Sequence, residues 1–119
     1  MSRIPLLIAG VATMLVLAAP SAGMSITKLT GTVGPGYTIT LKKGSATVKT
    51  LTPGKYSITV NDKSKTHNFH LKGPGVSKLT TVAFKGTKTW TVTLKKGTYT
   101  YVCDPHATIP SMKGTFKVA

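Results

Sequence analysis

The chain has few acidic residues and a single cysteine. Its 119 residues include two acidic side chains, Asp62 and Asp104, no glutamate, and one cysteine, Cys103. A mechanism with paired carboxylates would need both aspartates from distant turns, which argues against an enzyme of that kind. A single cysteine excludes an internal disulfide, so the thiol is an inert buried group, a link to a second chain or a metal ligand.

Arginine is absent after Arg3, and fifteen lysines dominate the charge. The formal charge is +14, and it would be +13 without Arg3. Because bidentate contacts to bases and phosphates are mostly made by arginine, and the lysines are scattered, we do not expect a nucleic-acid partner. The excess charge predicts an acidic partner, whose encounter would depend on salt. A surface that only keeps the protein soluble is the alternative.

The first 23 residues have the pattern of an export signal. Arg3 is followed by an apolar run over residues 4–19 and by small residues before Met24. The run is shorter than the roughly 20 residues of a membrane span. We therefore predict a cleaved secretory signal at 1–23 and a periplasmic or extracellular protein. We expect it to be a monomer with no membrane span after cleavage.

Residues 24–119 predict one all-β domain. No segment sustains a helical period, and short runs rich in Thr and Val alternate with Gly and Pro turns. Along 56–60 and 89–94, hydrophobic residues occupy one face and Thr, Ser or Lys the other, as in sheets with one buried side. This pattern predicts an antiparallel sandwich or barrel. The expected strands are 26–33, 37–41, 46–51, 56–60, 67–71, 80–84, 89–94, 98–103 and 114–118.

Four residues predict a metal site. Cys103, His106 and Met112 lie on one short segment, and His67 lies 36 residues before Cys103. Thiolate and thioether favour copper, and two histidines, a cysteine and a weak axial methionine form the type 1 blue-copper site of electron-transfer proteins. This set of side chains suits zinc poorly, since thioether is not a usual zinc ligand. We predict that these four residues bind one copper ion.

The same residues carry a resemblance to a known family. His67-Asn68, with the later Cys103-x-x-His106 and Met112, resembles the small cupredoxins, the plastocyanin and amicyanin group, over residues 25–119. The resemblance implies an antiparallel Greek-key β-sandwich of the cupredoxin kind, with His67, Cys103, His106 and Met112 as copper ligands. It also implies that Asn68 ties the two ligand segments together near the sulfur. Five residues separate His106 from Met112, a longer gap than is common in this family.

In the resembling family the ligand histidine of the last loop reaches the surface through an apolar patch. Here that patch is expected around His106, from Ala107, Ile109, Pro110 and residues 73–76. The lysines expected near it are Lys72, Lys78 and Lys113. An acidic redox partner would dock there in a brief, weak encounter.

Alternatives remain for two side chains and for the function. His70 is a competing ligand, but strand alternation puts it on the face opposite His67. Met112 could instead pack against Phe116. The main prediction is an exported electron carrier that is not itself an enzyme. The alternatives are a copper-binding or copper-delivery protein, and a metal-free basic sandwich that binds an acidic polymer or cell surface.

Overall fold

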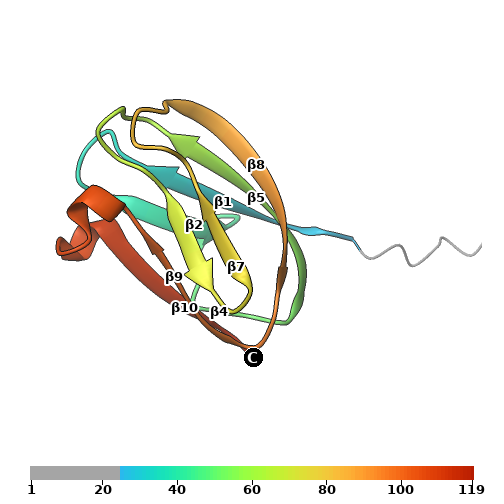
Figure 1. Ribbon diagram of the computed structural model, residues 1–119. Coiled ribbons are helices and arrows are strands. Elements are labelled where there is room, and N and C mark those ends of the chain that lie inside the picture. The colour runs from blue at the N-terminus through green and yellow to red at the C-terminus, as the bar shows by residue number, and fades with distance from the viewer. Residues whose placement is uncertain (1–24) are drawn as a thin grey trace, which may run out of the picture.

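Two five-stranded sheets pack face to face in the computed structural model, which describes residues 25–119 (Figure 1). The predicted signal at 1–23 lies outside the described residues. The first sheet has the order β3 (Ala46–Thr47), β2 (Ile39–Lys43), β1 (Thr27–Val33), β5 (Gly54–Asp62), β8 (Gly86–Leu94). The second has the order β4 (Thr50–Leu51), β10 (Lys113–Val118), β9 (Gly97–Val102), β6 (His70–Gly73), β7 (Val76–Leu79).

The chain passes repeatedly from one sheet to the other, and the predicted β-sandwich is confirmed. Most neighbouring strands are antiparallel, while β1 pairs with β5 and β4 pairs with β10 in parallel. Two short 3-10 helices, η1 (Asp104–His106) and η2 (Pro110–Met112), join β9 to β10. Among residues 25–119, no helix has the length and apolar character needed to cross a membrane.

The alternation seen in the sequence decides which side chains form the core. In β5, Tyr56, Ile58 and Val60 are buried while their neighbours are partly exposed. They face the second sheet, where Tyr99 and Phe116 stack with ring centroids 5.3 Å apart. Burying these side chains provides the main stabilisation of a domain without a disulfide.

Three predicted strands differ from those in the structure, and β7 was not predicted. The predicted strand 46–51 is divided into β3 and β4, which belong to different sheets. The predicted strand 80–84 is wrong, because β7 ends at Leu79 and residues 80–85 form a turn. The predicted strand 67–71 begins only at His70. Over residues 67–69 no regular strand pairing forms: Asn68 N donates to Cys103 Sγ at 3.4 Å, and Phe69 N donates to Thr80 Oγ1 at 2.9 Å while Phe69 O accepts from Thr80 N at 3.0 Å.

Candidate metal centre

Three of the four predicted ligand residues meet at one end of the sandwich. His67 lies in the irregular segment before β6, Cys103 follows β9, and His106 ends η1. His67 Nδ1 and His106 Nδ1 are 3.0 Å apart, and Cys103 Sγ lies 3.6 Å from the first and 3.4 Å from the second. His67 and Cys103 are buried and His106 is half-buried.

The spacing of these three atoms suits a metal ion. The point in the plane of these three atoms that is equidistant from them lies about 1.9 Å from each. A first-row transition metal such as zinc forms bonds of roughly 2.0–2.3 Å to imidazole and thiolate. The donor set, two imidazoles and one thiolate, matches that of blue-copper sites. His67, Cys103 and His106 could therefore hold a copper ion with little movement.

Hydrogen bonds hold both the backbone and the sulfur of Cys103, and the residue is buried. Its backbone N donates to Met112 O at 3.0 Å, and its carbonyl accepts from His106 N at 3.0 Å. Its Sγ accepts from Asn68 N at 3.4 Å. Burial raises the pKa of the thiol, although the donors at Asn68 and His106 act in the opposite direction. Without an ion the thiol form is favoured, so metal binding must displace a proton.

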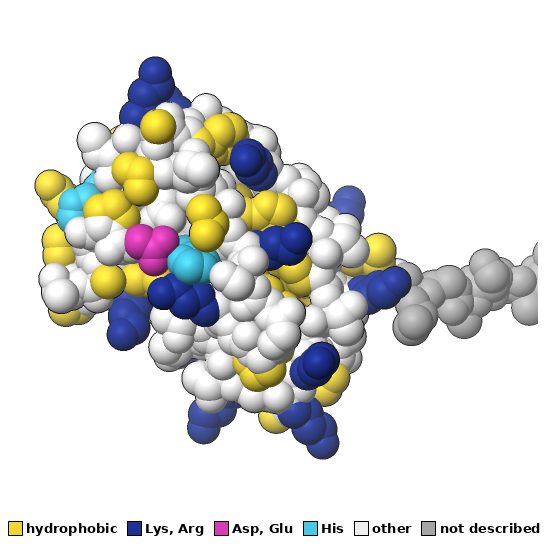
Figure 2. All heavy atoms as spheres, viewed as in Figure 1, with side chains coloured by type: hydrophobic (Ala, Val, Ile, Leu, Met, Phe, Trp, Pro, Cys, Tyr) yellow, Lys and Arg dark blue, Asp and Glu magenta, His cyan; other side chains and the backbone are white. Residues whose placement is uncertain are grey.

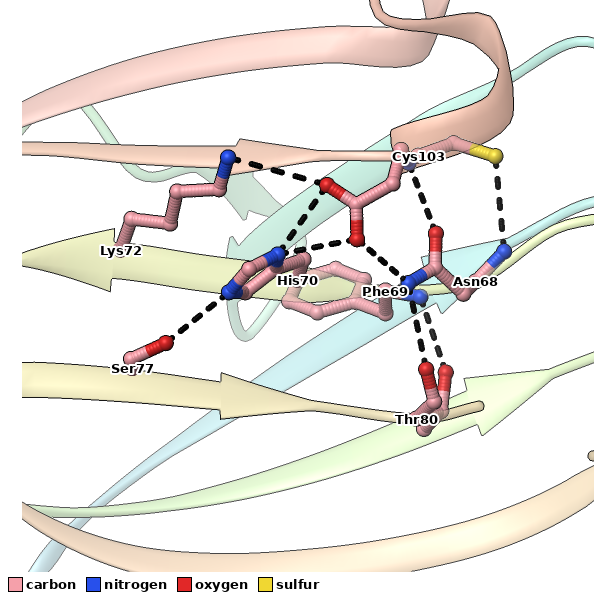
Figure 3. A network of polar contacts seen from close by, with 8 residues as sticks. Asn68, Phe69, His70, Lys72, Ser77, Thr80 and Cys103 are labelled. Atoms are coloured by element: carbon pink, nitrogen blue, oxygen red, sulfur yellow. Dashed lines mark hydrogen bonds and ion pairs between the residues drawn. The ribbon is translucent and has the colours of Figure 1, made fainter. Parts of the chain in front are cut away.

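Asn68 joins the two ligand segments, as the resemblance implied (Figure 3). Its Oδ1 accepts from Asp104 N at 2.7 Å, and its Nδ2 donates to Asp104 Oδ2 at 2.8 Å and to Thr80 O at 3.2 Å. The side chain is 2% exposed. The buried side chain of Asn68 thus links the segment of His67 to Asp104, which follows Cys103, and to Thr80 in the turn that follows β7.

His70 lies outside the cluster, as predicted, although residues 67–69 do not belong to the strand on which that prediction rested. Its Nδ1 lies 2.9 Å from Asp104 Oδ2, and its Nε2 lies 3.0 Å from Ser77 Oγ (Figure 3). Burial acts to raise the pKa of Asp104, but hydrogen bonds from Asn68 and His70 and the charges of His70 and Lys72 hold it below its usual value. The ion pair between His70 and Asp104 therefore links the start of β6 to the start of η1.

Met112 is fully buried at the end of η2, in the same core cluster as Cys103. Its backbone N donates to Ile109 O at 2.9 Å, and its carbonyl accepts from Cys103 N. The loop between His106 and Met112 is thus closed by two short helical turns, which accommodate its length. Met112 lies at the same end of the sandwich as the three converging residues.

The predicted surface patch is partly wrong. Because β6 runs antiparallel to β9, Lys72 lies opposite Thr100 and the turn at 73–76 lies beside the start of β9. There Tyr99 Oη donates to Pro74 O at 3.3 Å. This turn is therefore at the end of the sandwich away from Cys103, and it cannot surround His106.

A different loop, 34–38, takes that position, and the sequence analysis missed its role. The Tyr37 ring lies edge-on to His67 and His106, with centroid distances of 5.3 Å and 5.1 Å. A Cβ on Gly34 would lie 3.2 Å from His67 Cδ2, and Gly34 has a φ of +71°. The Gly34-Pro35-Gly36 turn signal was visible in the sequence, but it did not reveal which residues the turn would touch.

The model of one protein family matches most of the chain. It describes copper-binding proteins of the plastocyanin/azurin family and matches residues 32–119. A sequence comparison with curated proteins finds no match.

Several solved structures share the fold. One is the copper protein rusticyanin, with 20% identity and a TM-score of 0.58, covering 77% of this chain and 76% of its own. Another is reduced auracyanin from the photosynthetic bacterium Roseiflexus castenholzii, with 18% identity and a TM-score of 0.55, covering 80% of this chain and 98% of its own. Rusticyanin from Thiobacillus ferrooxidans has 23% identity and a TM-score of 0.50, covering 77% and 76%.

Proposed function

The chain belongs to the plastocyanin/azurin family of copper-binding proteins, with one copper ion as its cofactor, and we propose that it is an exported carrier of single electrons. His67, Cys103 and His106 would hold the ion, with Met112 as the fourth ligand residue. When bound, copper supplies one-electron exchange between Cu(I) and Cu(II). The observation that carries the proposal is the convergence of the three donor atoms, all within 4.8 Å of one another.

Rigidity of the chain around these residues supports electron transfer. The two oxidation states of copper prefer different geometries, so a carrier works best when its ligands move little. Here Cys103 is held by backbone bonds to His106 and Met112, and Asn68 links it to the segment of His67. An exchangeable site for copper delivery would need looser ligands.

The burial of the proposed ligands supports a carrier over an enzyme. The hollows of about 500, 300 and 450 Å³ on residues 25–119 are lined by residues other than these four. His67 and Cys103 are 3% and 0% exposed, so of the three converging residues only His106, which is half-buried, borders solvent. Electrons can cross such a covering, whereas substrate atoms cannot.

The charge distribution supports an acidic redox partner. Of the two acidic residues, Asp62 is buried, and Asp104 pairs with His70 and with Lys72 at 3.7 Å. The lysines therefore dominate the solvent-exposed charge, and Figure 2 shows them spread over the face in view. Opposite charge on a partner would speed its encounter in a salt-dependent way. Export and a monomeric state complete the proposal.

The test is the visible absorption spectrum of the purified protein after Cu(II) is added. We expect an intense sulfur-to-copper charge-transfer band that bleaches on reduction, and we expect Cys103→Ser to abolish it. His70→Gln is the matched control, because it changes a nearby histidine outside the cluster and should keep the band. A protein that binds no copper and stays colourless would refute the proposal and favour a metal-free basic sandwich.

A further inference from the structure

A hollow beside the candidate metal centre is lined by two lysines. It has a volume of about 500 Å³ and lies where β5 ends and β8 begins. Its lining residues are Pro35, Asn61, Asp62, Lys63, Lys85, Gly86 and Thr87. Pro35 connects it to the loop whose Gly34 lies against His67. The hollow therefore borders the loop that covers the two converging histidines.

The hollow presents positive charge to solvent, despite the aspartate in its lining. Asp62 is 2% exposed, accepts hydrogen bonds from Ser64 N at 3.2 Å and Thr80 Oγ1 at 2.9 Å, and has its pKa raised by burial. Its oxygens are thus directed into the protein. Solvent meets Lys63 and Lys85, both exposed, so the site selects anions.

Tyr37 adds an apolar contact next to this charge. It is 57% exposed, more than Ile26, Leu79 or Val82, the other large hydrophobic residues that the structure leaves exposed. Its backbone is held by a hydrogen bond from Ser111 Oγ to Tyr37 O at 2.5 Å. Tyrosine is enriched among the residues that contribute most to binding at protein interfaces.

We propose that Tyr37 and the hollow between Lys63 and Lys85 form one docking surface for an acidic redox protein. Carboxylates of the partner occupy the hollow, and an apolar side chain packs on Tyr37. The partner then lies one aromatic ring away from His67 and His106. This inference rests on the proposed function, because a partner that exchanges electrons must approach the metal centre, and it adds which residues the partner contacts.

The chain contains a matched control for charge at a second hollow. This one has a volume of about 450 Å³ and is also lined by two lysines, Lys78 and Lys95. Gly75 and Val76 line it too, and they belong to the turn that lies away from Cys103. Reversing the charge of either lysine pair changes the net charge equally, so only the position relative to the metal centre differs.

The experiment is an amide NMR titration of the copper-loaded, reduced protein, repeated on the metal-free protein. The probes are hexaglutamate and a second hexapeptide in which the third glutamate is replaced by phenylalanine. We expect chemical shift changes centred on residues 34–37, 61–63 and 85–87. Lys63→Glu with Lys85→Glu should weaken binding about tenfold more than Lys78→Glu with Lys95→Glu. Tyr37→Ser should weaken binding of the phenylalanine peptide and leave that of hexaglutamate unchanged.

Equal losses for the two lysine pairs, or shifts spread over lysines on every face, would overturn the docking surface. So would a Tyr37→Ser variant that binds both peptides as the parent does. If the copper-thiolate band is present when this happens, the proposed electron carrier stands and only the docking surface fails. If that band is absent, both fail together.

Discussion

Replacing Asn68 with alanine tests whether one buried amide holds the metal-centre end of the sandwich together. The side chain bonds to Asp104 N, Asp104 Oδ2 and Thr80 O, at 2.7, 2.8 and 3.2 Å. Alanine removes all three bonds and adds no new contact. The metal-free protein should lose stability, and the segment after Cys103 should lose its link to the segment after His67.

The expected magnitude follows from the partners left behind. A buried hydrogen bond contributes about 1 kcal/mol net, and a buried group left without a partner costs about 1–3 kcal/mol. Thr80 is fully buried, and its carbonyl would lose the bond from Asn68, while Asp104 lies partly in solvent. We expect a loss of about 3 kcal/mol, a large part of the roughly 5–15 kcal/mol typical of a small domain.

Urea unfolding of the metal-free protein measures this loss. With a slope of about 1.5 kcal/mol per molar urea, the midpoint should fall by about 2 M. Asn61→Ala is the matched control, because Asn61 makes one exposed side-chain bond, from Thr87 Oγ1 at 3.0 Å, and should cost under about 0.5 kcal/mol. If Asn68→Ala costs no more than Asn61→Ala, the reasoning that Asn68 joins the ligand segments is wrong.

Two further substitutions give separate predictions. Gly34→Ala should lower the melting temperature more than Gly44→Ala, because both have positive φ but only a Cβ at Gly34 meets neighbours, at 3.1 Å from Ser64 and 3.2 Å from His67. Equal losses would contradict a close contact of this loop. Asp104→Asn should destabilise the metal-free protein at pH 6, and the difference should shrink as the pH falls below about 4. This sign follows because the folded pKa of Asp104 is lowered, so its stabilisation is present above the unfolded pKa and lost as the carboxylate protonates. A pH series of urea midpoints measures it, and a difference that grows on acidification would refute it.

Local pattern was enough to predict the sandwich and the metal chemistry. Alternation along β5 and β8 reports burial directly, since side chains on a strand alternate between two faces. The donor types of His67, Cys103, His106 and Met112 predict copper because softness is a property of the side chain itself. The structure brings three of the four together, and ligation of copper by all four stays a prediction.

The tertiary structure alone decided what surrounds those residues. Sequence spacing does not show which strand ends meet, so the sequence analysis placed the turn at 73–76 near His106. The antiparallel pairing of β6 with β9 instead puts this turn at the opposite end of the sandwich. For the same reason it missed Tyr37, which reaches the two histidines from the first sheet. Residues 67–69 were predicted as strand because a hydrophobic pattern cannot show that Asn68 N would bond to Cys103 Sγ and Phe69 to Thr80 in place of a neighbouring strand. The local order of residues and the types of the donor side chains therefore determined the fold class and the chemistry. Strand pairing and register, which depend on contacts distant in sequence, determined which residues cover the site and form its surface.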